Sequence, residues 1–302
     1  MAPEVRPPSH LSNPLATLEQ LSTSGSQLDG ISADLETSIL FAGATLTQAA
    51  GILLHLPQDI IASAIVTYSR FWVGAEGGSL REYGAKDISA ASIYLTAKLS
   101  AFPKSPRSVL NVYSFLAAVP STFTDLDKFS ELDYEESCYL SEGAYQSRRN
   151  LLTKMETIIL RVLGFQTHVA LPYALCINYL QALDVFKGPS GKALASKAFE
   201  YLNASLLNPQ LLYLTHQPPA LATSAIYLAA REIGVKLPEE EWWEVFDTDR
   251  EELGFLVVAM LSMEGFVGEE KGKWEGGSVP LTVEGVEKEI ERRNGVNGHD
   301  TL

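Results

Sequence analysis

The sequence has few cysteines and few basic side chains, and each shortage excludes a class of protein. With only Cys138 and Cys176 among 302 residues, the chain cannot build a four-cysteine zinc cluster or a framework of several disulfides. We expect two reduced thiols of an intracellular protein. Lys and Arg number 23 against 37 Asp and Glu, which gives a net charge of −14 at pH 7. Because tracking a phosphate backbone needs a basic surface, no direct contact with nucleic acid is expected.

Long apolar runs are also scarce. Residues 37–58 carry no charged side chain and would be long enough to cross a bilayer, but Thr45, Thr47 and Gln48 lie in their middle. That mixture favours an interior helix of a large helical core, and no membrane partner is expected. The opening residues MAPEVRPPSHLSNP lack the apolar run of a signal peptide.

The common catalytic and metal-binding motifs are missing from the sequence. Its five histidines are scattered singly, and it contains no H-E-x-x-H, C-x-x-C or G-x-S-x-G pattern. Trp242, Trp243 and Phe246 would suit a cation cage, but at a short helix we interpret them as buried rings. We therefore expect no catalytic residue, no metal and no cofactor.

What the sequence does have is helical spacing of its apolar residues almost throughout. Leader and tail differ: residues 1–33 are rich in Pro, Ser and Gly, and residues 268–302 are charged and Gly-rich. We expect a flexible leader and a mostly disordered tail, with a short helix near 283–293. Between them the pattern predicts an all-α fold with helices at 34–55, 59–72, 87–101, 106–116, from about 133 to 163, 172–184, 191–207, 219–233, 238–246 and 250–266.

An internal repeat organises these helices. SIYLTAK at 92–98 aligns with AIYLAAR at 225–231, at an offset of 133 residues, and both segments are rich in small side chains. Small side chains let neighbouring helices approach closely, so each segment suits the centre of a bundle. The repeat predicts two tandem five-helix bundles, the first at 34–166 and the second at 167–267.

Four stretches together resemble the cyclins: LTQAAGILLHLPQDIIASAIVTYSRFW, ISAASIYLTAK, METIILRVLGFQTHVALPYALCINYLQAL and LATSAIYLAAREIGVKLPEEEWWEVF. The resemblance covers roughly residues 34–266. It is strongest to the transcription-type group, cyclin L in particular, and the Trp-Trp-x-Val-Phe stretch is similar to cyclin Q (also called cyclin M). It implies two tandem cyclin boxes and a nuclear regulatory subunit, without catalytic residues, that activates a cyclin-dependent kinase.

In the cyclins, the first box presses its third and fifth helices against the C-helix of the kinase, which orders the kinase active site. The family's lysine at the end of the third helix matches Lys98, and its glutamate in the fifth helix matches Glu156. The resemblance implies that the two form an ion pair and bind kinase backbone. Leu99 and Leu160 match apolar contact positions of the family.

The chain also departs from the family. Ser100 and Ala101 stand where cyclins usually have two acidic residues, and Leu40 replaces an arginine of the first helix. These departures leave a second hypothesis open, a cyclin-fold scaffold or adaptor that no longer activates a kinase. A DNA-binding factor of the TFIIB kind would need a zinc ribbon and a basic face, and nothing in the sequence argues for an unrecognised helical enzyme.

The negative charge is unevenly distributed. Residues 1–120 hold 7 basic and 9 acidic side chains, whereas residues 121–302 hold 16 and 28. Within the first part, Lys98, Lys104 and Arg107 form a segment with three positive charges and no negative one. We add Lys104 and Arg107 to the expected kinase-binding residues, because the face that the resemblance assigns to the kinase is locally basic.

Overall fold

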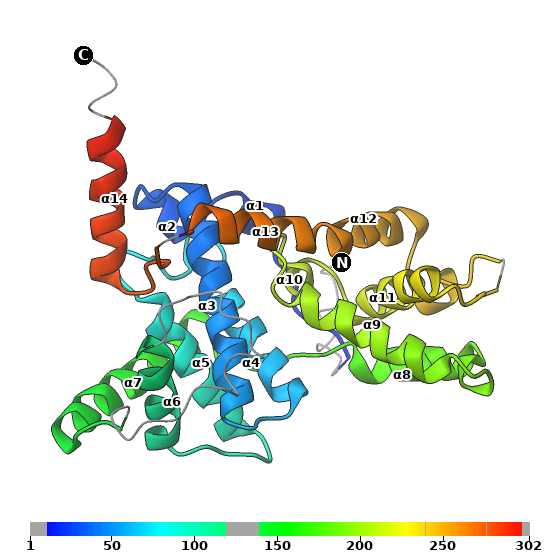
Figure 1. The fold of residues 1–302 in the computed structure, drawn as a ribbon, viewed down its shortest axis with the longest axis horizontal. Helices are drawn as coiled ribbons and strands as arrows, with labels where there is room; N and C mark the ends of the chain where they lie inside the picture. The colour runs from blue at the N-terminus through cyan, green and yellow to red at the C-terminus, as the bar shows by residue number, and fades with distance from the viewer. Residues whose placement is uncertain (1–10, 119–138, 239, 276, 298–302) are drawn as a thin grey trace, which may run out of the picture. The chain divides into compact units, whose positions relative to one another are not determined.

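The computed structural model describes residues 11–118, 139–238, 240–275 and 277–297. All regular elements within these ranges are helices, as the sequence predicts (Figure 1). The chain forms two compact units. We call residues 18–167 with 269–302 the N-terminal bundle, and residues 1–17 with 168–268 the C-terminal bundle. No helix within the described ranges is both long enough and apolar enough to span a bilayer.

The N-terminal bundle is built around α5 (Ala85–Leu99), which contacts the four helices that surround it. Its small residues, among them Ala90, Ala91, Ser92 and Ala97, are buried, which explains how so many helices approach one axis. The surrounding helices are α3 (Ala33–Leu53), α4 (Gln58–Phe71), α6 (Pro106–Ala118) and α7 (Glu142–Val162).

A buried chain of hydroxyl groups ties three helices of this bundle together. The Ser89 hydroxyl of α5 lies 2.6 Å from that of Thr47 in α3 and 2.5 Å from that of Tyr113 in α6. Burial raises the pKa of Tyr113, so its hydroxyl stays protonated and keeps the hydrogen bond. Buried polar groups that are satisfied in this way fix the register of neighbouring helices.

The C-terminal bundle repeats this plan around α11 (Pro218–Ile233), which contacts the other long helices of the bundle. Ala222, Ser224, Ala225, Ala229 and Ala230 are buried along it. The first residues of α5 and α11 are 133 positions apart, so the repeat is confirmed as a repeat of central helices. The other helices of this bundle are α8 (Tyr173–Ala182), α9 (Gly191–Ser205), α10 (Leu212–Thr215), α12 (Arg250–Leu261) and the first part of α13 (Met263–Lys273).

Three helix predictions were wrong in detail. The predicted helix at 238–246 is reduced, within its described residues, to a 3-10 turn, Glu244–Phe246. The predicted helix at 250–266 divides at Ser262 into α12 and α13. The helix expected to begin at residue 87 begins at Ala85, with Gly84 at the cap position. The start predicted for α7, at about 133, lies outside the described residues.

Of the three rings predicted to be buried, Trp243 and Phe246 are half-buried and Trp242 is buried. Its edge meets Phe246 at 6.0 Å, and Phe246 stacks on Tyr179 of α8 at 4.0 Å between ring centroids. This packing explains the short turn. The rings gain more by entering the bundle together than the backbone would gain from two further turns of helix.

The leader and the tail have more contacts than the sequence pattern predicts. Asn13 is buried in the C-terminal bundle, where its side chain donates to the Ala170 carbonyl and accepts from the Ala170 N–H, both at 2.8 Å. The leader also forms α1 (Leu18–Ser22) and α2 (Gly25–Leu28), and the tail forms α14 (Val283–Asn297), where a short helix near 283–293 was predicted. Hydrogen bonds to backbone groups hold Asn13, and Val279 and Val286 of the tail are buried.

Candidate functional site

The side chains of Lys98 and Glu156, which come from different helices, form one ion pair. Lys98 lies in the last turn of α5, and its Nζ is 2.9 Å from Oε1 of Glu156 in α7. The Glu156 side chain is 9% exposed and that of Lys98 is 53% exposed. The hydrogen bond to Glu156 raises the pKa of Lys98. A charge that is half in water and is oriented by a buried partner is well placed to bind the polar backbone of another protein.

The surface near this pair is apolar and open. Leu99 follows Lys98 directly and is 62% exposed, and Phe102, three residues further on, is 51% exposed. Leu160, one turn after Glu156 on α7, is half-buried. Exposed large apolar side chains near an oriented charge are typical of a protein–protein contact rather than of a catalytic centre.

Phe165 is a candidate contact residue that the sequence analysis missed. It lies just after α7, is 70% exposed, and has a positive φ of 61°. Its N–H donates to the carbonyl of Leu160 at 2.8 Å, which turns the chain back over the end of the helix. The preceding Gly164 also has a positive φ and was the available signal, since glycine commonly ends a helix in this conformation.

Arg107 and Lys104 lie in the segment that follows α5. The Nη2 atom of Arg107 is 2.6 Å from Oε2 of Glu142, and its guanidinium stands 4.0 Å from the centroid of the Tyr145 ring. Arg107 thus contacts the first turns of α7, whereas Glu156 lies several turns further along that helix. Lys104 is half-buried in the connection between α5 and α6.

The positions that depart from the family have local structural roles. The Ser100 hydroxyl donates to the Ala97 carbonyl at 2.8 Å and accepts from the Phe102 N–H at 3.0 Å, so Ser100 ends α5. Ala101 is exposed, and Leu40 is half-buried in α3. Segment 98–107 itself contains no acidic side chain, so the acids that pair with Lys98 and Arg107 both come from α7.

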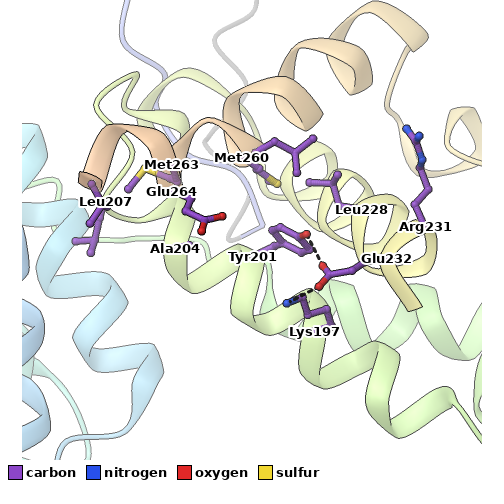
Figure 2. Close-up of a pocket in the computed structure, with 12 residues that line it drawn as sticks. Lys197, Tyr201, Ala204, Leu207, Leu228, Arg231, Glu232, Met260, Met263 and Glu264 are labelled. Atoms are coloured by element: carbon purple, nitrogen blue, oxygen red, sulfur yellow. Dashed lines mark hydrogen bonds and ion pairs between the residues drawn. The ribbon is translucent and has the colours of Figure 1, made fainter. Parts of the chain in front are cut away.

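A hollow of about 780 Å³ lies in the C-terminal bundle (Figure 2). At one end Lys197 pairs with Glu232 at 2.9 Å, and the Tyr201 hydroxyl donates to Glu232 at 2.6 Å. Met260 and Met263 line its apolar wall. The hollow therefore has an apolar wall beside an ion pair, and Arg231 and Glu264 also line it.

Chemistry that would indicate a metal or a reactive thiol is absent from the part of the chain that the structure describes. No three His, Cys, Asp or Glu side chains there are grouped to hold a metal ion. The Cys176 thiol is buried, and burial raises its pKa to about 12, so it is not a nucleophile at neutral pH. Cys138 lies outside the described residues.

The fold and this surface define a class of protein, an all-α chain of two related helical bundles with an ion pair and exposed apolar side chains at the end of the first central helix. No family model matches the chain. Human cyclin-L1 is 30% identical over 246 residues, which cover 81% of this chain and 43% of that protein. Human cyclin-L2 is 29% identical over 254 residues, covering 84% and 45% respectively.

The fold is similar to a chain in the crystal structure of the yeast RNA Pol II CTD kinase CTDK-1 complex, with a TM-score of 0.65. The two chains are 13% identical, and the similarity covers 94% of this chain and 84% of that one. The chain belongs to the cyclin family. It spans less than half the length of the curated cyclin L proteins that it matches.

Proposed function

We propose that the chain is a regulatory subunit that forms a heterodimer with a cyclin-dependent serine/threonine kinase and activates it. It would act in the nucleus, in transcription by RNA polymerase II or in RNA processing. Support for this setting comes from the cyclin L relatives and from the structural neighbour, which belongs to a kinase complex named for the RNA polymerase II CTD. The catalytic groups would belong to the kinase, and this chain would supply the surface that orders them.

The observation that carries the proposal is the Lys98–Glu156 pair and its apolar surroundings. Glu156 is buried and holds Lys98 at 2.9 Å, so the ammonium group is oriented before any partner binds. Leu99 and Phe165 expose large apolar side chains at the ends of the same two helices. Pre-orientation lowers the entropy that association must overcome, and burial of large apolar side chains by a partner removes their surface from water.

The first test is capture of a kinase by the tagged chain, followed by identification by mass spectrometry. We expect a cyclin-dependent kinase in the eluate. Lys98→Ala combined with Glu156→Ala should weaken its capture by about tenfold or more, since both removed groups belong to the proposed contact. The matched control is Lys197→Ala with Glu232→Ala, which removes a Lys–Glu pair of the same length from the C-terminal bundle.

A second variant separates binding from folding. Leu99→Ser removes a side chain that is already 62% exposed, so we expect little change in melting temperature but a clear loss of kinase capture. Val258→Ser is the control, because Val258 in α12 is 67% exposed. If Leu99→Ser and the double alanine variant both capture and activate the kinase normally, or if no kinase is recovered, the scaffold hypothesis raised by Ser100 and Ala101 replaces this proposal.

A further inference from the structure

Ser105 and Pro106 form the only pair in the 302-residue sequence in which a serine or threonine precedes a proline. The chain has 15 prolines, and the other 14 follow different residues. The pair lies inside the positively charged segment 98–107, flanked by Lys104 and Arg107. Proline after the acceptor hydroxyl is the sequence feature that proline-directed kinases require, so this position stands apart from every other serine and threonine of the chain.

The structure places the Ser105 hydroxyl where an enzyme can reach it. Ser105 is exposed and lies in a stretch without regular structure that ends where α6 begins at Pro106. Its Oγ accepts from the Ser108 N–H at 3.1 Å and lies 2.8 Å from the Ser108 hydroxyl. Both partners belong to the first turn of α6, whose residues Arg107 and Ser108 are exposed. That turn can open at low cost and let the segment extend into a kinase cleft.

We propose that Ser105 is a phosphorylation site for a proline-directed serine/threonine kinase that uses ATP. The Ser105 Oγ attacks the γ-phosphorus of ATP, and the new Oγ–P bond replaces the bond between that phosphorus and the oxygen that bridges it to the β-phosphorus. The hydroxyl proton passes to the catalytic base of the kinase, and ADP leaves.

The phosphate has a favourable place in the folded chain. It stands at the start of a helix of 13 residues, where the helix dipole favours a negative charge and the Ser108 N–H already donates to the Ser105 side chain. Lys104 and Arg107 flank it in the sequence and supply further positive charge. Phosphorylation therefore keeps α6 folded, and the modified chain should melt at a slightly higher temperature than the unmodified one.

The consequence for binding depends on the function proposed above. A phosphoserine carries about −1.5 to −2 charges at neutral pH. Lys98 and Arg107 of segment 98–107 already pair with Glu156 and Glu142, so the added phosphate makes the charge of this surface net negative. That segment begins with Lys98 and Leu99, the proposed kinase contacts. A partner surface that complements a basic segment loses attraction when the phosphate is added, so phosphorylation of Ser105 acts as a negative regulator of kinase binding.

The modification is tested on the purified full chain with a kinase of the MAP kinase class and ATP, and the phosphate is located by tandem mass spectrometry. We expect one dominant site, Ser105. Ser105→Ala and Pro106→Ala should both abolish phosphate incorporation. The first removes the acceptor hydroxyl, and the second removes the proline that the kinase recognises. Ser108→Ala is the matched control and should retain at least half of the phosphate incorporation of the unchanged chain. Phosphate elsewhere, none at all, or full incorporation in Pro106→Ala would overturn the site.

The regulatory effect is tested by kinase capture with phosphorylated and phosphatase-treated chain. We expect at least fivefold less cyclin-dependent kinase to be captured by the phosphorylated form. Ser105→Ala that has been incubated with the modifying kinase and ATP should show no such loss. Equal capture by both forms would overturn the regulatory role. A chain that captures no kinase in either form contradicts the proposed function and the regulation together, whereas the mapped phosphate still decides whether Ser105 is the modification site.

Discussion

At the scale of single residues, two glycines inside helices have opposite surroundings. Gly43 of α3 faces Tyr68 of α4, and a Cβ atom at Gly43 would overlap the Tyr68 hydroxyl. Tyr68 is fully buried with its ring edge against Trp72, so it has no room to retreat. Gly254 of α12 has nothing within 4 Å of the position where its Cβ would lie. The first glycine allows a close helix contact, while the second only adds backbone freedom to a helix.

These surroundings predict opposite effects of the same substitution. Gly43→Ala should lower the free energy of unfolding by about 1–3 kcal/mol, because α3 and α4 must move apart or Tyr68 must shift. Gly254→Ala should raise it by about 0.5–1 kcal/mol through the lower backbone entropy of the unfolded chain. Urea unfolding of each variant, followed by circular dichroism, gives the two values. A shift in the same direction for both would show that local packing does not decide the effect.

At the scale of helices, the sequence predicted the central pair best. Buried small residues with helical spacing mark α5 and α11, and the offset of 133 between them also relates the first residues of α4 and α9, Gln58 and Gly191. The correspondence between the helices of the two bundles ends after the central helices α5 and α11. There α6 is a full helix, while its predicted counterpart becomes a turn, because Trp242 and Phe246 are drawn into the bundle. Local propensity cannot report such tertiary packing.

The candidate site was predictable only in part. The pairing of Lys98 with Glu156 followed from the resemblance, since 58 residues separate them and no local pattern joins them. Phe165 was missed because its position depends on a left-handed backbone turn rather than on hydropathy. A polar pair or an exposed ring has no periodic sequence pattern. The sequence therefore gives the residue type, and only the folded structure shows which residues lie next to it.

The tail helix α14 is attached to α3 by charge. Asp34 in the first turn of α3 accepts from Lys273 at 2.7 Å and lies 3.5 Å from Arg293 of α14. Glu289 accepts from both Arg292 and Arg293. The hydrogen bonds from Lys273 and Arg292, together with Arg293, lower the pKa values of the two carboxyl groups, to about 2 for Glu289. Both acids are therefore charged at neutral pH, where Asp34 keeps the contact between α3 and α14 and Glu289 keeps the ion pairs inside α14.

Lowering the pH should release this tail before the bundle unfolds. A carboxyl group with a lowered pKa in the folded state stabilises the fold above its unfolded pKa of about 4, and that contribution is lost as the pH falls towards the folded pKa. We expect amide exchange in residues 283–297 to accelerate between about pH 4 and pH 2, after correction for the intrinsic rate. Asp34→Asn should weaken the same contact at pH 7. Unchanged protection of α14 in this variant would show that the ion pairs do not hold it.

At the scale of the whole molecule, each end of the chain belongs to the bundle that is more distant in sequence. Residues 11–17 are part of the C-terminal bundle, where Gln217 donates to the Asn13 carbonyl at 2.9 Å and the Ala16 N–H donates to Leu214 at 2.8 Å. Residues 269–297 are part of the N-terminal bundle, where the Lys86 N–H donates to the Leu281 carbonyl at 3.0 Å. Truncations should therefore act on the opposite half of the chain.

Deleting residues 1–17 should raise amide exchange in α8 and α11 and leave α3 and α5 unchanged, because the deletion leaves the buried N–H and carbonyl of Ala170 without their Asn13 partners. Deleting residues 277–302 should raise exchange at the start of α3 and α5 and spare α8 and α11, since it removes Val279 and Val286 from the N-terminal bundle. Each truncation serves as the control for the other. Amide exchange mapped by mass spectrometry decides the outcome. An effect of each deletion confined to the bundle nearer to it in sequence would contradict the assignment of each end to the more distant bundle. Loss of kinase capture by the first truncation alone would place the contact surface outside α5 and α7.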